Sequence, residues 1–91
     1  MKKKMIVVKG RVQGVGFRYV TKQLADELEI KGTVANQDDG SVYIEAQGSD
    51  EQMERFITKL KNNPTPFSKV ETIDITDSEK LDNFISFKIT N

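Results

Sequence analysis

The spacing of apolar residues along the chain changes repeatedly between the period of a strand and that of a helix. A continuous apolar run at 5–8, extended through Val12, predicts a central strand buried on both faces. Two glycines within 13–16 then predict a turn with unusual backbone angles. A helix that ends at 31–32 is predicted next, because apolar side chains recur at spacings of three and four, at Phe17, Val20, Leu24 and Leu28.

The middle of the chain has the pattern of a hairpin. A short β-prone segment at 33–37 leads into the turn signal Asp-Asp-Gly-Ser at 38–41. A strand over 42–47 follows, in which one face is covered, because every second residue is apolar, at Val42, Ile44 and Ala46. Gly48 ends this strand.

A second helix and two further strands complete the pattern. Ser49 is a good N-cap with Gln52 as its capping-box partner, and an apolar stripe at helical spacing follows, at Met53, Phe56, Ile57 and Leu60. The helix ends at 62–64, where Asn63 can take the left-handed position before a proline. Strands are predicted over 70–75, with Ile73 and Ile75 on one face, and over 84–89, with a polar loop at 76–83 between them.

The order β-α-β-β-α-β-β predicts an α+β fold, the ferredoxin-like α/β sandwich. Two right-handed β-α-β units joined by a hairpin form one mostly antiparallel sheet with both helices on one face. The C-terminal strand is expected to extend an edge of this sheet. With 91 residues, we expect a single domain over 1–91, because a second core would have no room.

Charge is balanced overall but not along the chain. Fourteen Lys and Arg offset fourteen Asp and Glu, which argues against a broad surface for a polyanion. Residues 1–22 nevertheless hold seven cations and no acid, and the first carboxylate is that of Asp26. A local positive field of this kind favours a small anionic ligand. The cations are Lys2, Lys3, Lys4, Lys9, Arg11, Arg18 and Lys22.

The missing residue types exclude much chemistry. The chain has no Cys and no His, which excludes disulfides, cysteine nucleophiles, phosphohistidine intermediates, His acid catalysis and Cys/His zinc sites. No apolar run approaches the length of a membrane span, and the run at 5–8 is too short for a signal peptide. We therefore expect a cytoplasmic protein with no membrane partner.

The segment 10–18, between a predicted strand and a predicted helix, carries the candidate chemistry. A glycine-rich turn can point successive N–H groups into one concavity, and the helix N-terminus adds free donors and a positive dipole. The segment is neither a Walker loop nor a dinucleotide loop. Arg18 in the first helical turn opposes the dipole, which makes sense if an anion lies between its planar fork and the amides. The alternatives are a tight connection and a solvated surface arginine.

Two segments resemble the signatures of the acylphosphatase family, namely 8–18 (VKGRVQGVGFR) and 32–42 (GTVANQDDGSV). The resemblance implies a ferredoxin-like fold, hydrolysis of carboxyl-phosphate anhydrides, no metal and no cofactor. It also implies two catalytic side chains, Arg18 and Asn36. The implied phosphate-binding loop consists of Gln13, Gly14, Val15, Gly16, Phe17 and Arg18.

The chain departs from the family pattern at three places. Thr33 and Ala35 stand where a tryptophan and a basic residue are common, and 63–66 replaces a Gly-Pro-Pro-like turn. These changes affect local packing and substrate attraction. They leave Arg18 and Asn36 in place.

The mechanism expected from this resemblance is in-line attack of water on phosphorus. The loop amides and Arg18 hold the phosphoryl oxygens, and Asn36 holds the water. The expected ligands are a small-molecule acyl phosphate and inorganic phosphate, bound by a monomer. One alternative is a non-catalytic module that binds acyl or carbamoyl phosphate. Another is an RNA-binding domain of the same fold. The first strand, at 6–10, lacks the aromatic residues that stack on bases and the third has only Tyr43, so no nucleic acid is expected.

Overall fold

The computed structural model describes residues 1–79 and 83–91. Within these residues the elements follow the predicted order of strands and helices. They are β1 (Lys2–Arg11), α1 (Phe17–Glu27), β2 (Lys31–Asn36), β3 (Val42–Gly48), α2 (Asp50–Lys61), β4 (Lys69–Asp77) and β5 (Phe87–Ile89).

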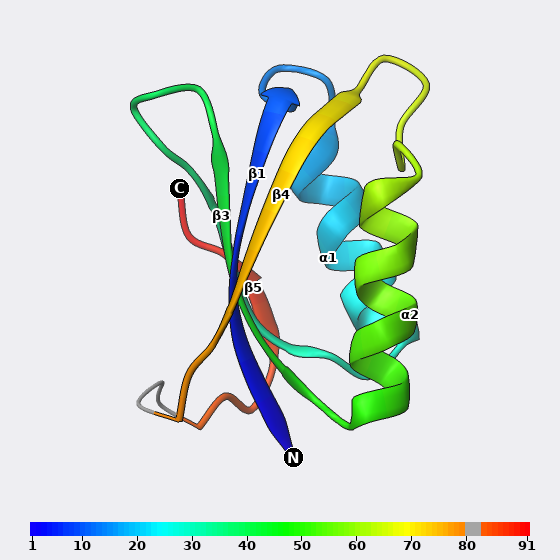
Figure 1. The fold of residues 1–91 in the computed structure, drawn as a ribbon, viewed down its shortest axis with the longest axis vertical. Coiled ribbons are helices and arrows are strands. Elements are labelled where there is room, and N and C mark those ends of the chain that lie inside the picture. Colours follow the sequence, from blue (N-terminus) through cyan, green and yellow to red (C-terminus); the bar gives the residue numbers. More distant parts are fainter. Residues whose placement is uncertain (80–82) are drawn as a thin grey trace.

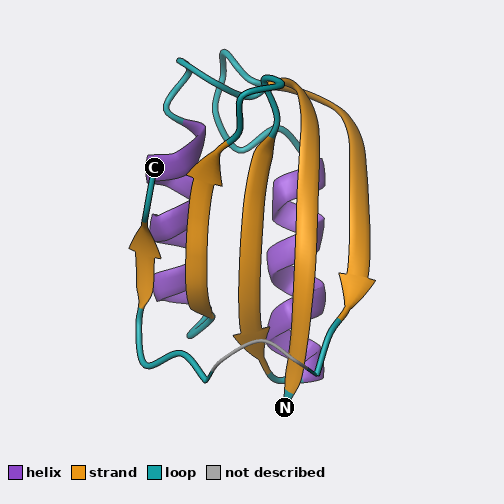
Figure 2. Ribbon diagram, turned by 90° about the vertical axis from the view of Figure 1, so that its left-hand side faces the viewer, coloured by secondary structure: helices purple, strands orange, loops and turns teal. Residues whose placement is uncertain are grey.

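The strands form one sheet in the order β4-β1-β3-β2-β5 (Figure 2). β1 pairs antiparallel with β3 and β4, and β2 pairs antiparallel with β3. Only the short β5 pairs parallel, with β2, among the strands that the structure describes. The ferredoxin-like fold and the C-terminal strand at the sheet edge are therefore confirmed.

Both helices cover the same face of the sheet (Figure 1). This follows from the common hand of the two β-α-β crossovers, which places their helices on one side. As a result, β1 is central but is not buried on both faces, and that part of the prediction was wrong. Ile6 and Val8 face the helices and are fully buried, whereas Met5 and Val7 on the other face are half-buried.

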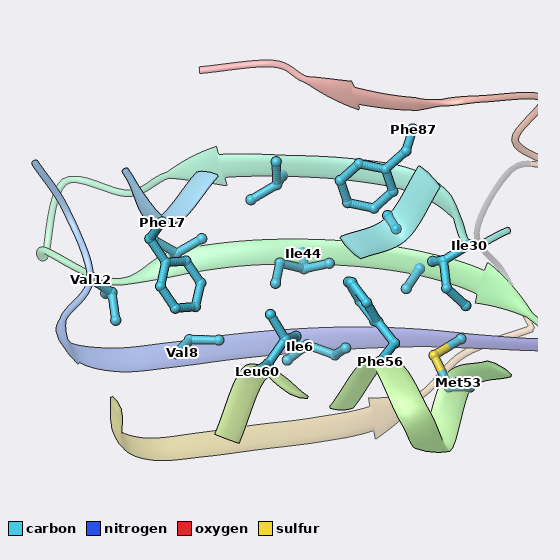
Figure 3. Close-up of a cluster of buried hydrophobic side chains, with 14 residues drawn as sticks. Ile6, Val8, Val12, Phe17, Ile30, Ile44, Met53, Phe56, Leu60 and Phe87 are labelled. Atoms are coloured by element: carbon cyan, nitrogen blue, oxygen red, sulfur yellow. The ribbon is translucent and has the colours of Figure 1, made fainter. Parts of the chain in front are cut away.

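The core lies between the sheet and the helices (Figure 3). Every second residue of β3 contributes to it, as the alternation predicts. Phe56 of α2 and Phe87 of β5 meet edge to face, with ring centroids 6.2 Å apart. The fully or nearly fully buried apolar residues are Ile6, Val8, Val12, Phe17, Ala25, Ile30, Val34, Val42, Ile44, Ala46, Met53, Phe56, Leu60 and Phe87.

Helix α1 is rotated slightly from the face that its apolar pattern predicts. The row that is fully buried consists of Phe17, Thr21 and Ala25. The predicted residues Leu24 and Leu28 flank this row and are only partly buried. Two small side chains at the centre of the contact let the helix approach the sheet closely, while the larger leucines fill the space at its sides.

The ends of α2 match their sequence signals. The Ser49 side chain accepts from the Gln52 N–H at 3.2 Å, and the Gln52 side chain accepts from the Ser49 N–H at 3.2 Å, so the predicted capping box is present. Asn63 has φ of 52°, the left-handed conformation expected there. Its Oδ1 accepts from the Val70 N–H at 2.8 Å, which links the helix end to β4. Neither helix of the described chain combines the length and the apolar character that crossing a membrane requires.

The largest boundary errors lie in the C-terminal third. β4 continues through Thr76 and Asp77, predicted as loop, because these residues still pair with β1 and Asp77 forms an ion pair with Lys4. The rest of that predicted loop includes residues 80–82, which lie outside the described residues. β5 begins at Phe87 and not at 84, because the Phe84 N–H and carbonyl bond the Gln47 side chain instead of a neighbouring strand.

Close contact between β2 and β3 makes Gly32 the most constrained glycine that the structure describes. Its φ is 147°, and a Cβ there would lie 1.7 Å from the Glu45 carbonyl oxygen. We expect Gly32→Ala to lower the free energy of unfolding by about 2–5 kcal/mol, because the backbone strain of alanine at this φ adds to the overlap of its Cβ with the Glu45 carbonyl. Urea denaturation followed by circular dichroism measures this loss.

Gly40→Ala is the matched control for this prediction. Gly40 also has positive φ, 91°, but a Cβ there would meet no atom within 4 Å. Only backbone strain of about 1–2 kcal/mol should then result. Equal losses in the two variants would show that the close approach at Gly32 does not matter.

Candidate active site

The loop between β1 and α1 is held at both ends by buried side chains. Val12 and Phe17 are each only 1% exposed, and both point into the core (Figure 3). Between them, Val15 also packs against the core. The loop therefore has little freedom to move, although its remaining residues lie at the surface.

Two glycines shape this loop into a concave backbone. Gly14 and Gly16 have φ of 72° and 78°, and a Cβ at either position would meet no atom within 4 Å. Their role is thus conformational, because neither is needed for close packing. Residues in left-handed conformation let successive N–H groups converge, which is the geometry of an anion nest.

The amides of this loop are free of partners within the described chain. None of the backbone N–H groups from Gly14 to Tyr19 donates to a residue of 1–79 or 83–91, and the first bond of the helix is from the Val20 N–H to the Gly16 carbonyl at 3.1 Å. The first turn of α1 also carries no acidic residue. These donors and the positive end of the helix dipole can therefore bind an anion.

Arg18 lies beside these amides, in the first turn of α1. It lines a surface pocket of about 210 Å³ together with Val12, Gly14, Gly16, Phe17, Tyr19 and Ile89. No residue that the structure describes forms an ion pair or side-chain hydrogen bond with its guanidinium. A half-buried cation beside unpaired amides is chemically suited to a phosphoryl group, which offers oxygens to both.

Gln13 does not line the pocket that contains Arg18. Its Nε2 donates to the carbonyl oxygens of Gln37 and Ser41, at 2.8 Å each. These carbonyls belong to the turn between β2 and β3, so one side chain joins the two signature segments. Of the predicted phosphate-binding loop, Gly14, Gly16, Phe17 and Arg18 line the pocket, whereas Gln13 and Val15 support the loop from outside it.

The β2–β3 turn that Gln13 binds is itself well ordered by hydrogen bonds. The Gln37 N–H donates to the Ser41 carbonyl at 2.9 Å, and the Ser41 N–H and hydroxyl both donate to the Asp39 carboxylate, at 2.9 and 2.5 Å. These two donors, the hydroxyl first, hold the pKa of Asp39 below its ordinary value. Asp39 therefore stays ionised at neutral pH and supports the turn.

Asn36 is the last residue of β2, directly before this turn. Its backbone pairs with Val42. The Asn36 N–H donates to the Asn91 carbonyl oxygen at 2.9 Å, and the Asn36 carbonyl oxygen accepts from the Asn91 Nδ2 at 3.2 Å. Its side-chain Oδ1 is buried and accepts no hydrogen bond from the described chain. The main chain of Asn36 is thus fixed on both sides, while its buried amide oxygen has no partner within residues 1–79 and 83–91.

The two predicted catalytic residues are therefore carried by neighbouring segments. Gln13 connects the loop before Arg18 to the turn after Asn36. The end of the chain makes a second connection, because Ile89 lines the Arg18 pocket and Asn91 bonds Asn36. Asn36 itself does not line that pocket. The loops concerned gather at one end of the sheet (Figures 1 and 2).

Sequence reasoning missed three residues of this region. Tyr19 and Ile89 line the pocket, and Asn91 holds the Asn36 backbone. Tyr19 had a detectable signal, because it is an aromatic residue directly after the candidate arginine. Ile89 and Asn91 had none, because only the pairing of β5 with β2 brings the C-terminal residues to this end of the sheet.

Other hollows of the surface lack these features. Three larger ones, of about 470–500 Å³, lie beside α2 or at the start of β1, away from the glycine loop. Their walls combine lysines with carboxylates, as in the one that contains Lys2, Lys4 and Asp50. Within residues 1–79 and 83–91, no three His, Cys, Asp or Glu side chains are grouped so that they could hold a metal ion. Size alone therefore does not identify the site.

Comparison with known proteins agrees with the fold and with both signature segments. The family model described as Acylphosphatase matches residues 4–89. The acylphosphatase of Lacticaseibacillus paracasei is 47% identical over 87 residues, which cover 96% of this chain and 94% of that protein. The acylphosphatase of Enterococcus faecalis is 47% identical over 89 residues, 98% of each chain.

A solved structure gives the same result. The crystal structure of the acylphosphatase from Bacillus subtilis matches with a TM-score of 0.95 and 43% identity, over 100% of both chains. These matches extend over strands, helices and loops alike, and they do not favour the alternatives of a non-catalytic module or an RNA-binding domain. The chain belongs to the acylphosphatase family.

Proposed function

We propose that this protein hydrolyses acyl phosphates to a carboxylate and inorganic phosphate, with Arg18 and Asn36 as its catalytic residues. The observation that carries the assignment of residues is the guanidinium of Arg18 beside the amides of residues 14–19, which have no partner within residues 1–79 and 83–91. Membership of the acylphosphatase family supports the reaction itself.

The phosphoryl group binds to the loop and to Arg18. The N–H groups of the nest and of the N-terminus of α1 bind its oxygens, and the planar guanidinium takes two oxygens at once. In a loose transition state the charge is spread over these oxygens, so preorganised donors stabilise it without having to move. Burial of Val12 and Phe17 supplies the preorganisation, because it fixes both ends of the loop.

Asn36 holds the attacking water. An amide side chain can donate to a water through Nδ2 and accept from it through Oδ1, and the Asn36 Oδ1 has no hydrogen-bond partner within the described residues. The backbone bonds to Asn91 and the pairing with Val42 keep the amide in one place. A water bound here can attack phosphorus in line with the departing carboxylate.

The leaving group and the proton need no strong acid or base from the protein. A carboxylate is a weak base and departs without being protonated. The chain has no His and no Cys, and no carboxylate lines the Arg18 pocket among the described residues, so the proton of the water passes to an oxygen of the phosphoryl group. The mechanism therefore uses positioning and charge stabilisation and needs no metal or cofactor.

Further properties are part of the same proposal. Residues 1–91 act as a single domain, since one core includes residues of every strand from β1 to β3 and of β5. The protein acts as a monomer. The protein acts in the cytoplasm on small molecules, with no nucleic-acid partner. In support, the apolar run at 5–8 is a strand paired on both sides, with β3 and β4, and is part of the fold.

Arg18→Gln tests the phosphoryl site. We expect the rate of benzoyl phosphate hydrolysis to fall roughly 10²- to 10³-fold, because one preorganised charged donor is lost. Inhibition by inorganic phosphate should weaken at the same time. Arg55→Gln is the matched control, because Arg55 is an exposed arginine paired with Glu51 on α2. If Arg18→Gln retained the rate of the unmodified protein, Arg18 would not be the phosphoryl ligand.

Asn36→Ala separates water positioning from phosphate binding. We expect kcat to fall roughly 10²-fold, as for the loss of a positioned group, while the inhibition constant of inorganic phosphate changes less than about twofold. Steady-state kinetics with phosphate as inhibitor measure both. Asn62→Ala, at the exposed end of α2, serves as the control. A parallel loss of phosphate affinity and kcat would contradict the role of Asn36.

The pH dependence tests the absence of a general base. His and Cys, whose ordinary pKa values lie nearest neutrality, do not occur in the chain. Burial and the Glu45 carboxylate raise the pKa of Tyr43 to about 12, so this tyrosine keeps its proton. We therefore expect kcat to vary less than about twofold between pH 6 and pH 8. A bell-shaped profile centred near neutrality would mean that a protein group transfers the proton.

A further inference from the structure

Two exposed apolar side chains border the pocket that contains Arg18. Tyr19 is 63% exposed and Ile89 is 42% exposed, and both line the pocket. They come from opposite ends of the chain, since Tyr19 is in the first turn of α1 and Ile89 ends β5. The pocket is therefore polar at the glycine loop and apolar at its outer rim.

Neither side chain is part of the buried core, because Tyr19 is 63% and Ile89 42% exposed. Among the described residues the pocket is lined by glycines, apolar residues, Tyr19 and Arg18, with no carboxylate. An aromatic ring and a branched aliphatic chain beside a lone guanidinium form a surface for a ligand that is anionic at one end and apolar at the other.

We propose that Tyr19 and Ile89 form the subsite for the acyl group, so that the protein favours acyl phosphates with a flat apolar or aromatic acyl group over the smallest ones. This rests on the proposed function, in which Arg18 holds the phosphoryl group. An acyl group joined to that phosphorus through one oxygen reaches the rim of the same pocket. There it covers apolar surface of Tyr19 and Ile89 that is otherwise exposed to water.

The test compares benzoyl phosphate with acetyl phosphate, which has the same anhydride but only a methyl group. We measure the ratio of kcat/KM for benzoyl phosphate to that for acetyl phosphate. For Tyr19→Ala the ratio should fall about threefold to tenfold, since one aromatic contact is lost. Ile89→Ala should lower it about twofold to fourfold, in proportion to its smaller apolar surface. Tyr19→Phe, which keeps the ring, should retain the ratio of the unmodified protein.

Matched controls separate the subsite from the phosphoryl site. Ile85→Ala removes a side chain that is 91% exposed and does not line the pocket, so its ratio should not change. The inhibition constant of inorganic phosphate should be the same in the Tyr19 and Ile89 variants as in the unmodified protein, because phosphate has no acyl group. An unchanged ratio in both Tyr19→Ala and Ile89→Ala overturns the subsite, even if Arg18→Gln is inactive. Full activity of Arg18→Gln overturns the proposed phosphoryl site instead.

Discussion

Burial of Val12 and Phe17 is the constraint on which the site depends. These two side chains enter the core on either side of a four-residue loop, so the loop cannot leave the sheet without exposing both. Val15 adds a third contact with the core. The glycines between them can then hold a backbone conformation that leaves six consecutive N–H groups, from Gly14 to Tyr19, without a partner in the described chain. Apolar packing thus offsets the cost of keeping these polar groups unpaired and places Arg18 beside them.

Hydrogen bonds extend this constraint to the second signature segment. The carboxamide of Gln13 bonds two carbonyls of the β2–β3 turn, and Asn91 bonds the main chain of Asn36. β2 and β1 end at the same end of the sheet, so the segments that carry Arg18 and Asn36, the two proposed catalytic residues, are close together. The ferredoxin-like topology brings these ends together, since β1 and β2 lie on either side of β3. The site is therefore built from loop ends that the sheet order makes neighbours.

Most elements could be predicted from local patterns. The capping box at Ser49 and the left-handed Asn63 are properties of a few adjacent residues, and both are present in the structure. Errors occur where the decisive partner is distant in the chain. β4 is longer than predicted because Asp77 pairs with Lys4, and β5 is shorter because the Gln47 side chain bonds Phe84. Two-sided burial of β1 was wrong because the side on which the helices pack depends on crossover hand.

The sequence by itself determined the order of the elements, the glycine loop and the candidate Arg18, because each depends on residue types at short spacing. Asn36 became a candidate only through the resemblance of 32–42 to the acylphosphatase signature. Only the tertiary structure decided which of the loop residues line the pocket and which support it. Gln13 and Val15 could not be told apart from Gly14 by spacing, since their side chains meet partners far along the chain. The apolar rim of Tyr19 and Ile89 depends likewise on long-range pairing, because β5 reaches α1 only through its parallel contact with β2.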